Sequence, residues 1–405
     1  MRSYLLALLA LLASPGAVAE APARPDTVRF ATFNVSMFRD RQGGLRADLA
    51  DPAMKQARLA AAILQQVRPD VVLLNEFDWD PQGESADLFR QHFLAVGQDG
   101  RQPLDYPYAY VPETNTGVHS GHDLDRDGVV SGAPGSRAYG GDAFGFGQFP
   151  GQYGFAILSR YPIDYERIRT FRLLRWKDLP DASIPGDWYS PAALEVLRLS
   201  SKNHVDVPIL IGDRVVHLLA SHPTPPTFDG PEDRNGARNA DEIRFWSLYL
   251  DAAGSDWPID DRGGKGGLGQ ASFVIVGDLN SDPVDGDSRH EAIRSLISDP
   301  RLQGTPVPAS AGGAEQARLQ GGANVLQAGD PAQDTADFDD RSVGNLRIDY
   351  VLPSSDLAVS ASGVFWPAST DEDFALVGTY PFPVSDHRLV WVEVRLDPPT
   401  ELPSR

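Results

Sequence analysis

Seven segments of the chain carry the hydrophobic pattern of β-strands. Each is a largely apolar run of seven to nine residues, rich in β-branched and aromatic side chains. The run at 71–77 opens with four successive apolar residues, which predicts a strand buried on both faces. The predicted strands are 28–34, 71–77, 153–160, 215–222, 272–280, 347–354 and 388–396.

Apolar residues at helical spacing predict three helices. Asp51 and Pro52 are typical N-cap and first-turn residues, and they precede an apolar stripe that runs to Pro69. Two further helices are predicted at 238–250 and around 289–297. Because strands and helices mix without strict alternation, the pattern favours the α+β class and a layered sandwich.

The N-terminal segment has the pattern of a secretory signal. Arg2 precedes the apolar run 4–13, which is too short to span a bilayer, and Ala17-Val18-Ala19 follows as a small-residue cleavage site. The alternative is a buried first helix. We therefore predict a signal peptide at 1–19 and export to the periplasm or the medium, with no membrane insertion of the mature chain.

Composition restricts the chemistry. The 405 residues include 56 Asp and Glu against 36 Lys and Arg, a formal net charge of −20. This charge argues against a non-specific grip on nucleic acid, although a nuclease with its own metal ions is not excluded. Cysteine is absent, which excludes disulfides, thiolate zinc sites and cysteine nucleophiles.

Polar side chains lie at or near one end of most predicted strands. A buried carboxylate is costly unless it is paired or binds a metal, so these groups are expected to converge on one rim. Taken singly, each has a structural alternative, such as a turn at Asn34, an Asx turn at Asp278 or an ion pair between Asp349 and Arg347. The set comprises Asn34, Glu76, His222, Asp278, Asn280, Asp349, Asp386 and His387.

Seven short motifs in this order resemble the endonuclease/exonuclease/phosphatase superfamily, which has the DNase I-like fold. The resemblance covers about residues 28–396 and implies a four-layer sandwich, with two mixed sheets face to face and helices outside. Residues 20–405 are then one catalytic domain, and the irregular stretches 97–152, 178–206, 254–270 and 300–345 are insertions. The motifs are Phe33-Asn34, Leu74-Asn75-Glu76, 154–160, Ser221-His222, 277–280, 347–350 and Ser385-Asp386-His387.

The resemblance implies hydrolysis of phosphoesters with Mg²⁺ or Mn²⁺, and it assigns roles residue by residue. Metal ligands are Glu76, Asn34 and Asp386. Asp278 and Asn280 orient water and phosphate. His387 is the catalytic histidine, Asp349 is its carboxylate partner, and His222 is a second histidine. The proline-rich segment after His222 departs from the family pattern and weakens the role of that residue.

Two other groups of residues are candidates for binding. Arg160, and Arg234, Arg238 and Asn239 near a predicted helix start, are phosphate-contact candidates, with a solvated strand end or a capping cluster as alternatives. Asp123, Asp125 and Asp127 open a segment like a calcium loop. Its twelfth position is Pro134 where Glu is needed, so Asp142 is a substitute ligand; the alternative is an acidic turn.

The favoured hypothesis is an exported, divalent-metal-dependent phosphoester hydrolase that acts on a small phosphorylated compound as a monomer. The acidic composition favours this substrate over nucleic acid. An extracellular endonuclease is the alternative within the family. A non-catalytic calcium-binding or scaffold protein on the same fold is the alternative of another class.

Overall fold

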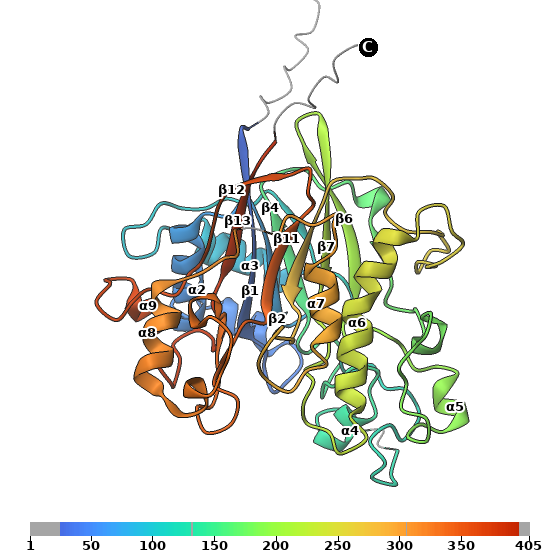
Figure 1. The fold of residues 1–405 in the computed structure, drawn as a ribbon. Helices are drawn as coiled ribbons and strands as arrows, with labels where there is room; N and C mark the ends of the chain where they lie inside the picture. The colour runs from blue at the N-terminus through green and yellow to red at the C-terminus, as the bar shows by residue number, and fades with distance from the viewer. Residues whose placement is uncertain (1–24, 131–132, 305, 397–405) are drawn as a thin grey trace, which may run out of the picture.

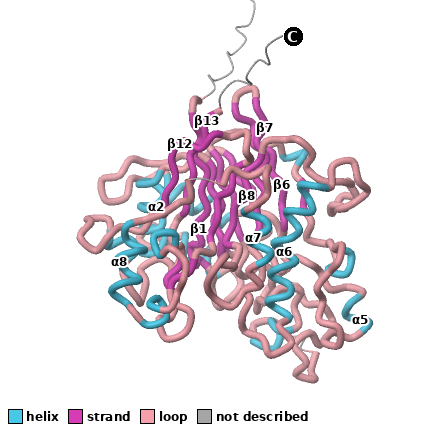
Figure 2. The backbone as a smooth tube through the Cα atoms, in the orientation of Figure 1, coloured by secondary structure: helices cyan, strands magenta, loops and turns pink. Residues whose placement is uncertain are grey.

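The computed structural model describes residues 25–130, 133–304 and 306–396. Two mixed β-sheets pack face to face at its centre, with helices and long loops around them (Figure 1; Figure 2). The predicted signal peptide at 1–19 lies outside the described residues. Within the described part of the chain, no helix combines the length and the apolar character that a membrane crossing needs.

The first sheet has six strands in the order β12-β13-β1-β2-β4-β3. β1 and β2 run parallel, and the other neighbours are antiparallel. The strands are β1 (Thr27–Met37), β2 (Val71–Phe77), β3 (Tyr108–Tyr110), β4 (Phe155–Ser159), β12 (Ala358–Val364) and β13 (Val390–Arg395).

The second sheet has five strands in the order β11-β8-β7-β6-β5. β7 and β8 run parallel, and the remaining pairs are antiparallel. The strands are β5 (Arg169–Thr170), β6 (His204–Ile211), β7 (Arg214–Ser221), β8 (Phe273–Asp278) and β11 (Asp349–Pro353), and a separate small ribbon pairs β9 (Ala336–Asp337) with β10 (Asn345–Leu346).

The central strands are buried on both faces because each sheet lies between the other sheet and a helical layer. In β2, Val71 and Leu73 join the core between the sheets, whereas Val72 and Leu74 join the core under α2 (Lys55–Val67). β8 divides its side chains in the same way between the sheet interface and the layer of α6 (Arg234–Asp251). This arrangement explains the continuous apolar run at 71–77 and confirms the predicted four-layer sandwich.

The other helices are short. α1 (Gly44–Leu49), α3 (Glu84–Phe89), the π-helical turn Arg90–Leu94 and α9 (Phe374–Val377) accompany the first sheet, and α7 (Glu291–Ile297) packs beside α6. The stretches predicted to be insertions contain α4 (Arg137–Gly141), α5 (Pro191–Leu194) and α8 (Ala311–Gln320). Short 3₁₀ turns occur at Tyr165–Arg167, Trp176–Asp178, Gly322–Val325 and Pro331–Gln333.

Two predicted helix starts are wrong. Asp51 does not cap a helix: its carboxylate accepts a hydrogen bond from the Ala53 amide in a turn, and α2 begins only at Lys55. α6 begins at Arg234, four residues before the predicted start, because the Asp229 carboxylate accepts a hydrogen bond from the Asn235 amide in its first turn.

Candidate active site

The core between the sheets ends in polar side chains at one end of the sandwich. Along β8, Val274 and Val276 belong to this core, and Asp278 follows on the same face two residues later. The same alternation leads to Asn34 on β1, to His222 just after β7, and to Asp349 on β11. Asp278 and Asp349 are direct partners in the antiparallel register, so strand pairing fixes their proximity.

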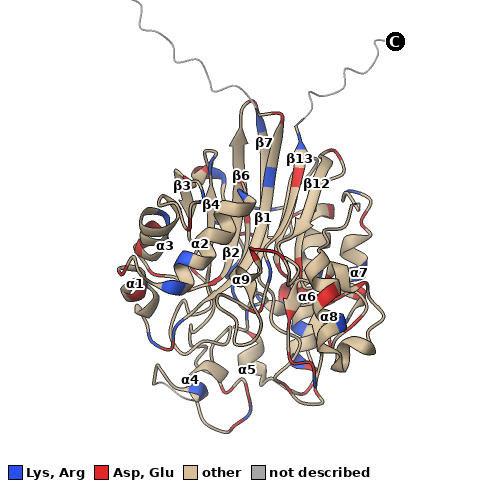
Figure 3. Ribbon diagram, turned by 90° about the vertical axis from the view of Figure 1, so that its left-hand side faces the viewer, with Lys and Arg blue, Asp and Glu red and all other residues tan. Residues whose placement is uncertain are grey.

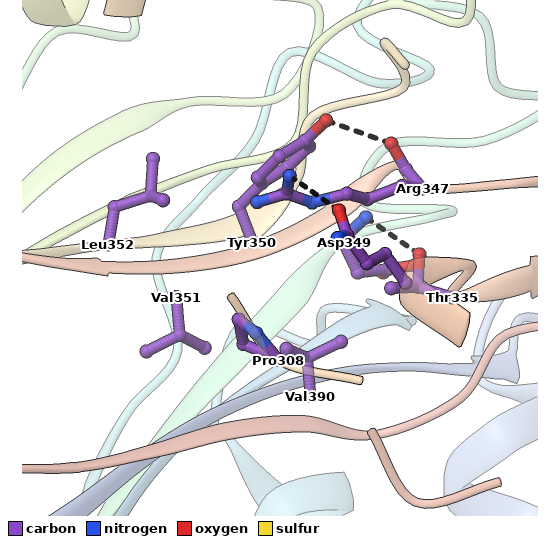
Figure 4. Close-up of a pocket in the computed structure, with 9 residues that line it drawn as sticks. Pro308, Thr335, Arg347, Asp349, Tyr350, Val351, Leu352 and Val390 are labelled. Atoms are coloured by element: carbon purple, nitrogen blue, oxygen red, sulfur yellow. Dashed lines mark hydrogen bonds between the residues drawn. The ribbon is translucent and has the colours of Figure 1, made fainter. Parts of the chain in front are cut away.

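Asp349 and His387 form a buried pair next to Asp278. His387 Nδ1 lies 2.9 Å from Asp349 Oδ2, and His387 Nε2 lies 3.8 Å from Asp278 Oδ2. The hydroxyl of Thr335 donates to the same Asp349 oxygen at 2.8 Å and accepts from the Asp349 amide, as Figure 4 shows in part. The carboxylate therefore orients the imidazole, and Thr335 in turn orients the carboxylate.

Asp278 contacts three of the other predicted site residues, Asn34, His222 and Asn280. The Asn34 amide donates to Asp278 Oδ2 at 3.1 Å, and His222 Nε2 lies 3.4 Å from the same oxygen. The Asn280 amide N–H donates to Asp278 Oδ1 at 3.0 Å, and its side chain donates to the Pro223 carbonyl. The structure thus brings Asn34, His222, Asp278, Asn280, Asp349 and His387 together.

The two histidines differ in charge: His387 is positive and His222 is neutral. Burial lowers the pKa of His387, but the charges of Asp349 and Asp278 outweigh burial and raise that pKa well above its usual value. The pKa of His222 is far below its usual value because of burial and the nearby positive charges of Lys202 and His387. At neutral pH His387 is an imidazolium and His222 is neutral, so the 3.4 Å contact of His222 with Asp278 is not an ion pair.

Glu76 reaches this site through an unusual backbone conformation. Strand alternation would place it on the helix-facing side of β2, with Val72 and Leu74. Its φ of 54° breaks the alternation, and Glu76 lines the cavity together with Asp386 and His387. A positive φ at a non-glycine residue is a local strain that the surrounding structure has to maintain.

The donor set fits a divalent cation. Burial raises the pKa of Glu76, and the like charge of Asp386 raises it further. A cation between the two carboxylates would relieve this repulsion, and oxygen ligands suit Mg²⁺ or Mn²⁺. Asp278, Asp349 and His387 also present ligand atoms within 4.8 Å of one another. The residues present therefore fit a divalent metal cation.

Lys202 is a site residue that the sequence analysis missed. Its ammonium group is buried, lies 3.4 Å from the Pro223 carbonyl and interacts with the charges of Glu242, Glu76 and Asp278. Burial lowers its pKa. Lys202 lies two residues before β6, a strand that the sequence pattern did not predict. No pattern in the sequence therefore indicated that Lys202 belongs to the site.

A cavity of about 690 Å³ opens above these residues. Its floor includes Glu76, Asp278, Asn280, Asp386 and His387. Its walls come from three loops, 225–228, 285–288 and 338–343, and from two aromatic rings, Phe38 and Tyr153, which are tilted by 44° to each other with centroids 4.6 Å apart. The floor and the polar end of the sheet interface therefore form one site.

The predicted phosphate-contact arginines lie outside this cavity. Arg160 pairs with Asp70 at 2.7 Å, at the end of β2 and β4 opposite Glu76. Arg234 pairs with Glu232 and lies over the ring of Trp188. Arg238 is buried and donates to the carbonyls of Leu199, Phe144 and Arg198. These three predictions are corrected: each arginine has a structural partner that fixes it elsewhere.

α6 holds the loops that surround the site. The Asn239 amide donates to the carbonyls of Thr224 and Leu279, so this residue positions the loops and does not line the cavity. The buried Glu242 carboxylate accepts from the amides of Ser201 and Thr224, both at 2.6 Å. These two residues adjoin Lys202 and the segment after His222, so Glu242 joins both to the helix.

The predicted calcium loop has a different third member. Carboxylate oxygens of Asp123, Asp125 and Asp142 lie within 4.8 Å of one another. The Asp127 carboxylate instead accepts from the Val129 amide at 2.8 Å, which corrects its predicted place in the cluster. Asp142 is fully buried, accepts a hydrogen bond from the Leu124 amide and supplies the third carboxylate of this cluster; its role as a calcium ligand stays a prediction.

A family model described as the endonuclease/exonuclease/phosphatase family matches residues 31–387. A search of curated proteins gave no match. Among solved structures, an endonuclease/exonuclease/phosphatase from Beutenbergia cavernae DSM 12333 is 20% identical, with a TM-score of 0.49, and the match covers 92% of this chain and 72% of that one.

Two further solved structures come from Bacteroides thetaiotaomicron. An endonuclease/exonuclease/phosphatase family protein is 12% identical, with a TM-score of 0.47, and the match covers 93% of this chain and 100% of that one. A mannosyl-6-phosphatase is 13% identical, with a TM-score of 0.44, and the match covers 91% of this chain and 99% of that one.

Proposed function

Since the chain belongs to the endonuclease/exonuclease/phosphatase family, whose members are typically phosphoester hydrolases, we propose that it is a divalent-metal-dependent hydrolase of phosphoester bonds. The observation that supports this most is the buried line of groups Asp349, His387 and Asp278, which opens into the cavity. Glu76, Asp386 and Asn34 would hold the cation, which supplies Lewis-acid stabilisation of charge on the phosphoryl oxygens.

Asp278 is the proposed general base. Burial raises the pKa of its carboxyl, which makes it a better proton acceptor than an exposed aspartate. As the water oxygen bonds to phosphorus, the water proton passes to Asp278, and the bond from phosphorus to the departing alcohol oxygen breaks. Asn280 orients the loop that carries Asp278.

His387 is the proposed cationic group at the phosphate. Asp349 keeps it protonated and oriented, so its charge offsets negative charge that develops on the phosphoryl group. The imidazolium gives a proton to the departing alcohol oxygen. Transfer of the proton from Asp278 to His387, across their 3.8 Å separation, then restores both groups.

A substrate panel tests this function. A chromogenic phosphomonoester, a chromogenic phosphodiester, plasmid DNA and sphingomyelin are each incubated with Mg²⁺, Mn²⁺ or Ca²⁺. His387→Ala and Asp278→Ala should each lower kcat by at least about 10²-fold, with an unchanged circular dichroism spectrum. Near-normal activity of either variant would reject the assignment.

The same panel separates the two alternatives. Preferential nicking of plasmid DNA at physiological salt would favour the endonuclease. Inertness of the wild type on every substrate would favour the non-catalytic scaffold.

We also propose that residues 1–19 are removed on export and that residues 20–405 act as one domain. The apolar run and the small-residue cleavage site support this. N-terminal sequencing of protein recovered from the periplasm or medium should begin at Glu20. Recovery of an intact N-terminus from the cytoplasm would contradict it.

Calcium binding by the 123–142 segment remains a separate prediction. The motif supports it, and one buried oxygen of Asp123 has no partner among the described residues. Calorimetric titration should give Ca²⁺ uptake that Asp125→Asn abolishes and Asp127→Asn retains, because the Asp127 side chain faces Val129. No heat with the wild type would end the idea.

A further inference from the structure

The cavity lining is rich in negative charge. Among the described residues that line it, none is Lys or Arg, and His387 on the floor supplies the positive charge. Figure 3 shows basic residues on helices and loops and on strands such as β7. Seven carboxylates line the cavity: Glu76, Asp278, Asp282, Asp285, Asp287, Asp339 and Asp386.

Four of these carboxylates belong to the walls and not to the floor. Three have structural partners: Asp282 accepts from the Arg347 amide, Asp285 accepts from the Ala328 and Gly329 amides, and Asp339 pairs with Arg341. The fourth, Asp287, is exposed and has no hydrogen bond or ion pair with any other described residue. Its charge is therefore available to a ligand.

Aromatic rings share the cavity walls with these carboxylates. Phe228 is 80% exposed on the 225–228 loop, although a large apolar side chain at that exposure gains nothing from the fold. Phe338 meets the ring of His387 edge-on at 5.7 Å, and the Phe38–Tyr153 pair completes the aromatic surface. Aromatic faces and carboxylates are the two groups that attract organic cations.

We propose that the cleft selects phosphoesters whose organic substituent carries an ammonium group. The inference rests on the proposed function and specifies the substrate for the same site. The phosphoryl group would lie on the floor beside His387, while Asp287 and the aromatic walls attract the cation. A polyanionic strand would meet carboxylates along the same walls and be repelled.

Three p-nitrophenyl phosphodiesters of matched size test the selection. Their second substituents are choline, its uncharged isostere 3,3-dimethylbutanol, and an anionic carboxypropanol. In each, water attacks phosphorus, the bond to the nitrophenyl oxygen breaks, and p-nitrophenolate is released while the second substituent stays on phosphate. We expect kcat/KM for the choline ester to exceed that for the dimethylbutyl ester by about tenfold, and that for the anionic ester by more.

Charge reversal in the wall provides the matched comparison. Asp287→Lys should bring the choline-to-dimethylbutyl ratio of kcat/KM to about one or below and should favour the anionic ester. Asp105→Lys makes the same charge change at an exposed residue that lies away from the cavity. Its neighbour Tyr106 donates a hydrogen bond to the Pro69 carbonyl, near the end of β2 that is remote from Glu76. This control should keep the wild-type ratio.

The outcomes distinguish the two proposals. Equal use of the choline and dimethylbutyl esters, or preference for the anionic ester, overturns the cation selection, as does an Asp287→Lys ratio equal to that of the wild type. The hydrolase proposal survives these results if His387→Ala still loses nitrophenolate release. Absence of release from all three esters by the wild type would overturn the cation selection, and it would overturn the hydrolase proposal as well if the wild type were also inert on every substrate of the panel.

Discussion

Asp334 shows how far burial can move a single carboxyl group from its usual behaviour. It is 6% exposed, and one of its oxygens has no hydrogen-bond partner among the described residues. Burial, followed by the charges of Asp282, Asp285 and Asp330, raises its pKa to about 8. Because the group precedes Thr335, which holds Asp349, its protonation bears on the stability of the site as well as of the fold.

The sign of the effect follows from proton binding. Between about pH 4 and pH 8 the folded chain keeps a proton on Asp334 that the unfolded chain releases, so stability falls as pH rises through this window. Asp334→Asn removes the ionisation and should raise the free energy of unfolding at pH 9 by about 2–5 kcal/mol. At pH 5 the effect should be smaller, about 1–2 kcal/mol, because the carboxyl group of the unfolded chain is already mostly ionised there.

Urea unfolding followed by tryptophan fluorescence at the two pH values measures this difference. Asp105→Asn, an exposed position remote from the cavity, is the control and should change neither value. Equal effects of Asp334→Asn at pH 5 and pH 9 would show that Asp334 is ionised in the folded protein.

Among the helices and strands, α6 holds two loops of the candidate site in place. The Glu242 carboxylate uses both oxygens to accept amide hydrogen bonds, from Ser201 and from Thr224. These bonds place Lys202 and the segment after His222 next to each other, although they come from different strands. The helix therefore acts as a clamp on two loops of the site.

Replacement of Glu242 by Gln tests the clamp. A glutamine offers one acceptor where the loops need two, so one amide loses its partner, and unfolding should become easier by about 1–3 kcal/mol. We expect kcat to fall while KM changes little, because displacement of Lys202 and His222 would change the surroundings of Asp278, the proposed base. Glu372→Gln on an exposed loop is the control. A loss of stability with unchanged kcat would limit Glu242 to a structural role.

The strands that form the centre of each sheet could be predicted from the sequence, because burial on both faces leaves continuous apolar runs such as 71–77. β6 could not: His204, Asp206 and Pro208 interrupt its pattern, and their burial depends on partners such as Tyr249, whose hydroxyl donates to Asp206. The predicted helix start at Asp51 was wrong because an aspartate also accepts amide hydrogen bonds in a turn, as Asp51 does from Ala53.

For the whole molecule, the site residues at strand ends could be predicted because strand order and pairing bring such residues to one edge. The arginines could not, because a basic residue is equally suited to phosphate and to a carboxylate such as Asp70, and only the fold shows which is near. Lys202 had no signal for the same reason: its neighbours Glu76 and Asp278 are remote in sequence.

Metal binding should also be visible in global stability. A cation that binds only the folded chain stabilises it, by about 2.7 kcal/mol at one hundred times its Kd. We expect Mg²⁺ to raise Tm after treatment with EDTA, and Glu76→Gln to lose most of this shift. Asp105→Asn should keep it. A full shift in the Glu76 variant would place the cation elsewhere.

The direct pairing of Asp278 with Asp349 fixes the positions of these two side chains through the strands, whereas the loops around the cavity can vary without changing that pairing. Under the proposed function, the position of the reacting groups depends on the register of β8 and β11, where a slip of one residue would turn Asp349 to the opposite face. The cavity walls at 225–228, 285–288 and 338–343 are loops that join this frame at their ends. Exchange of these loops between relatives is therefore a route to new specificities on an unchanged reaction, for evolution and for engineering alike.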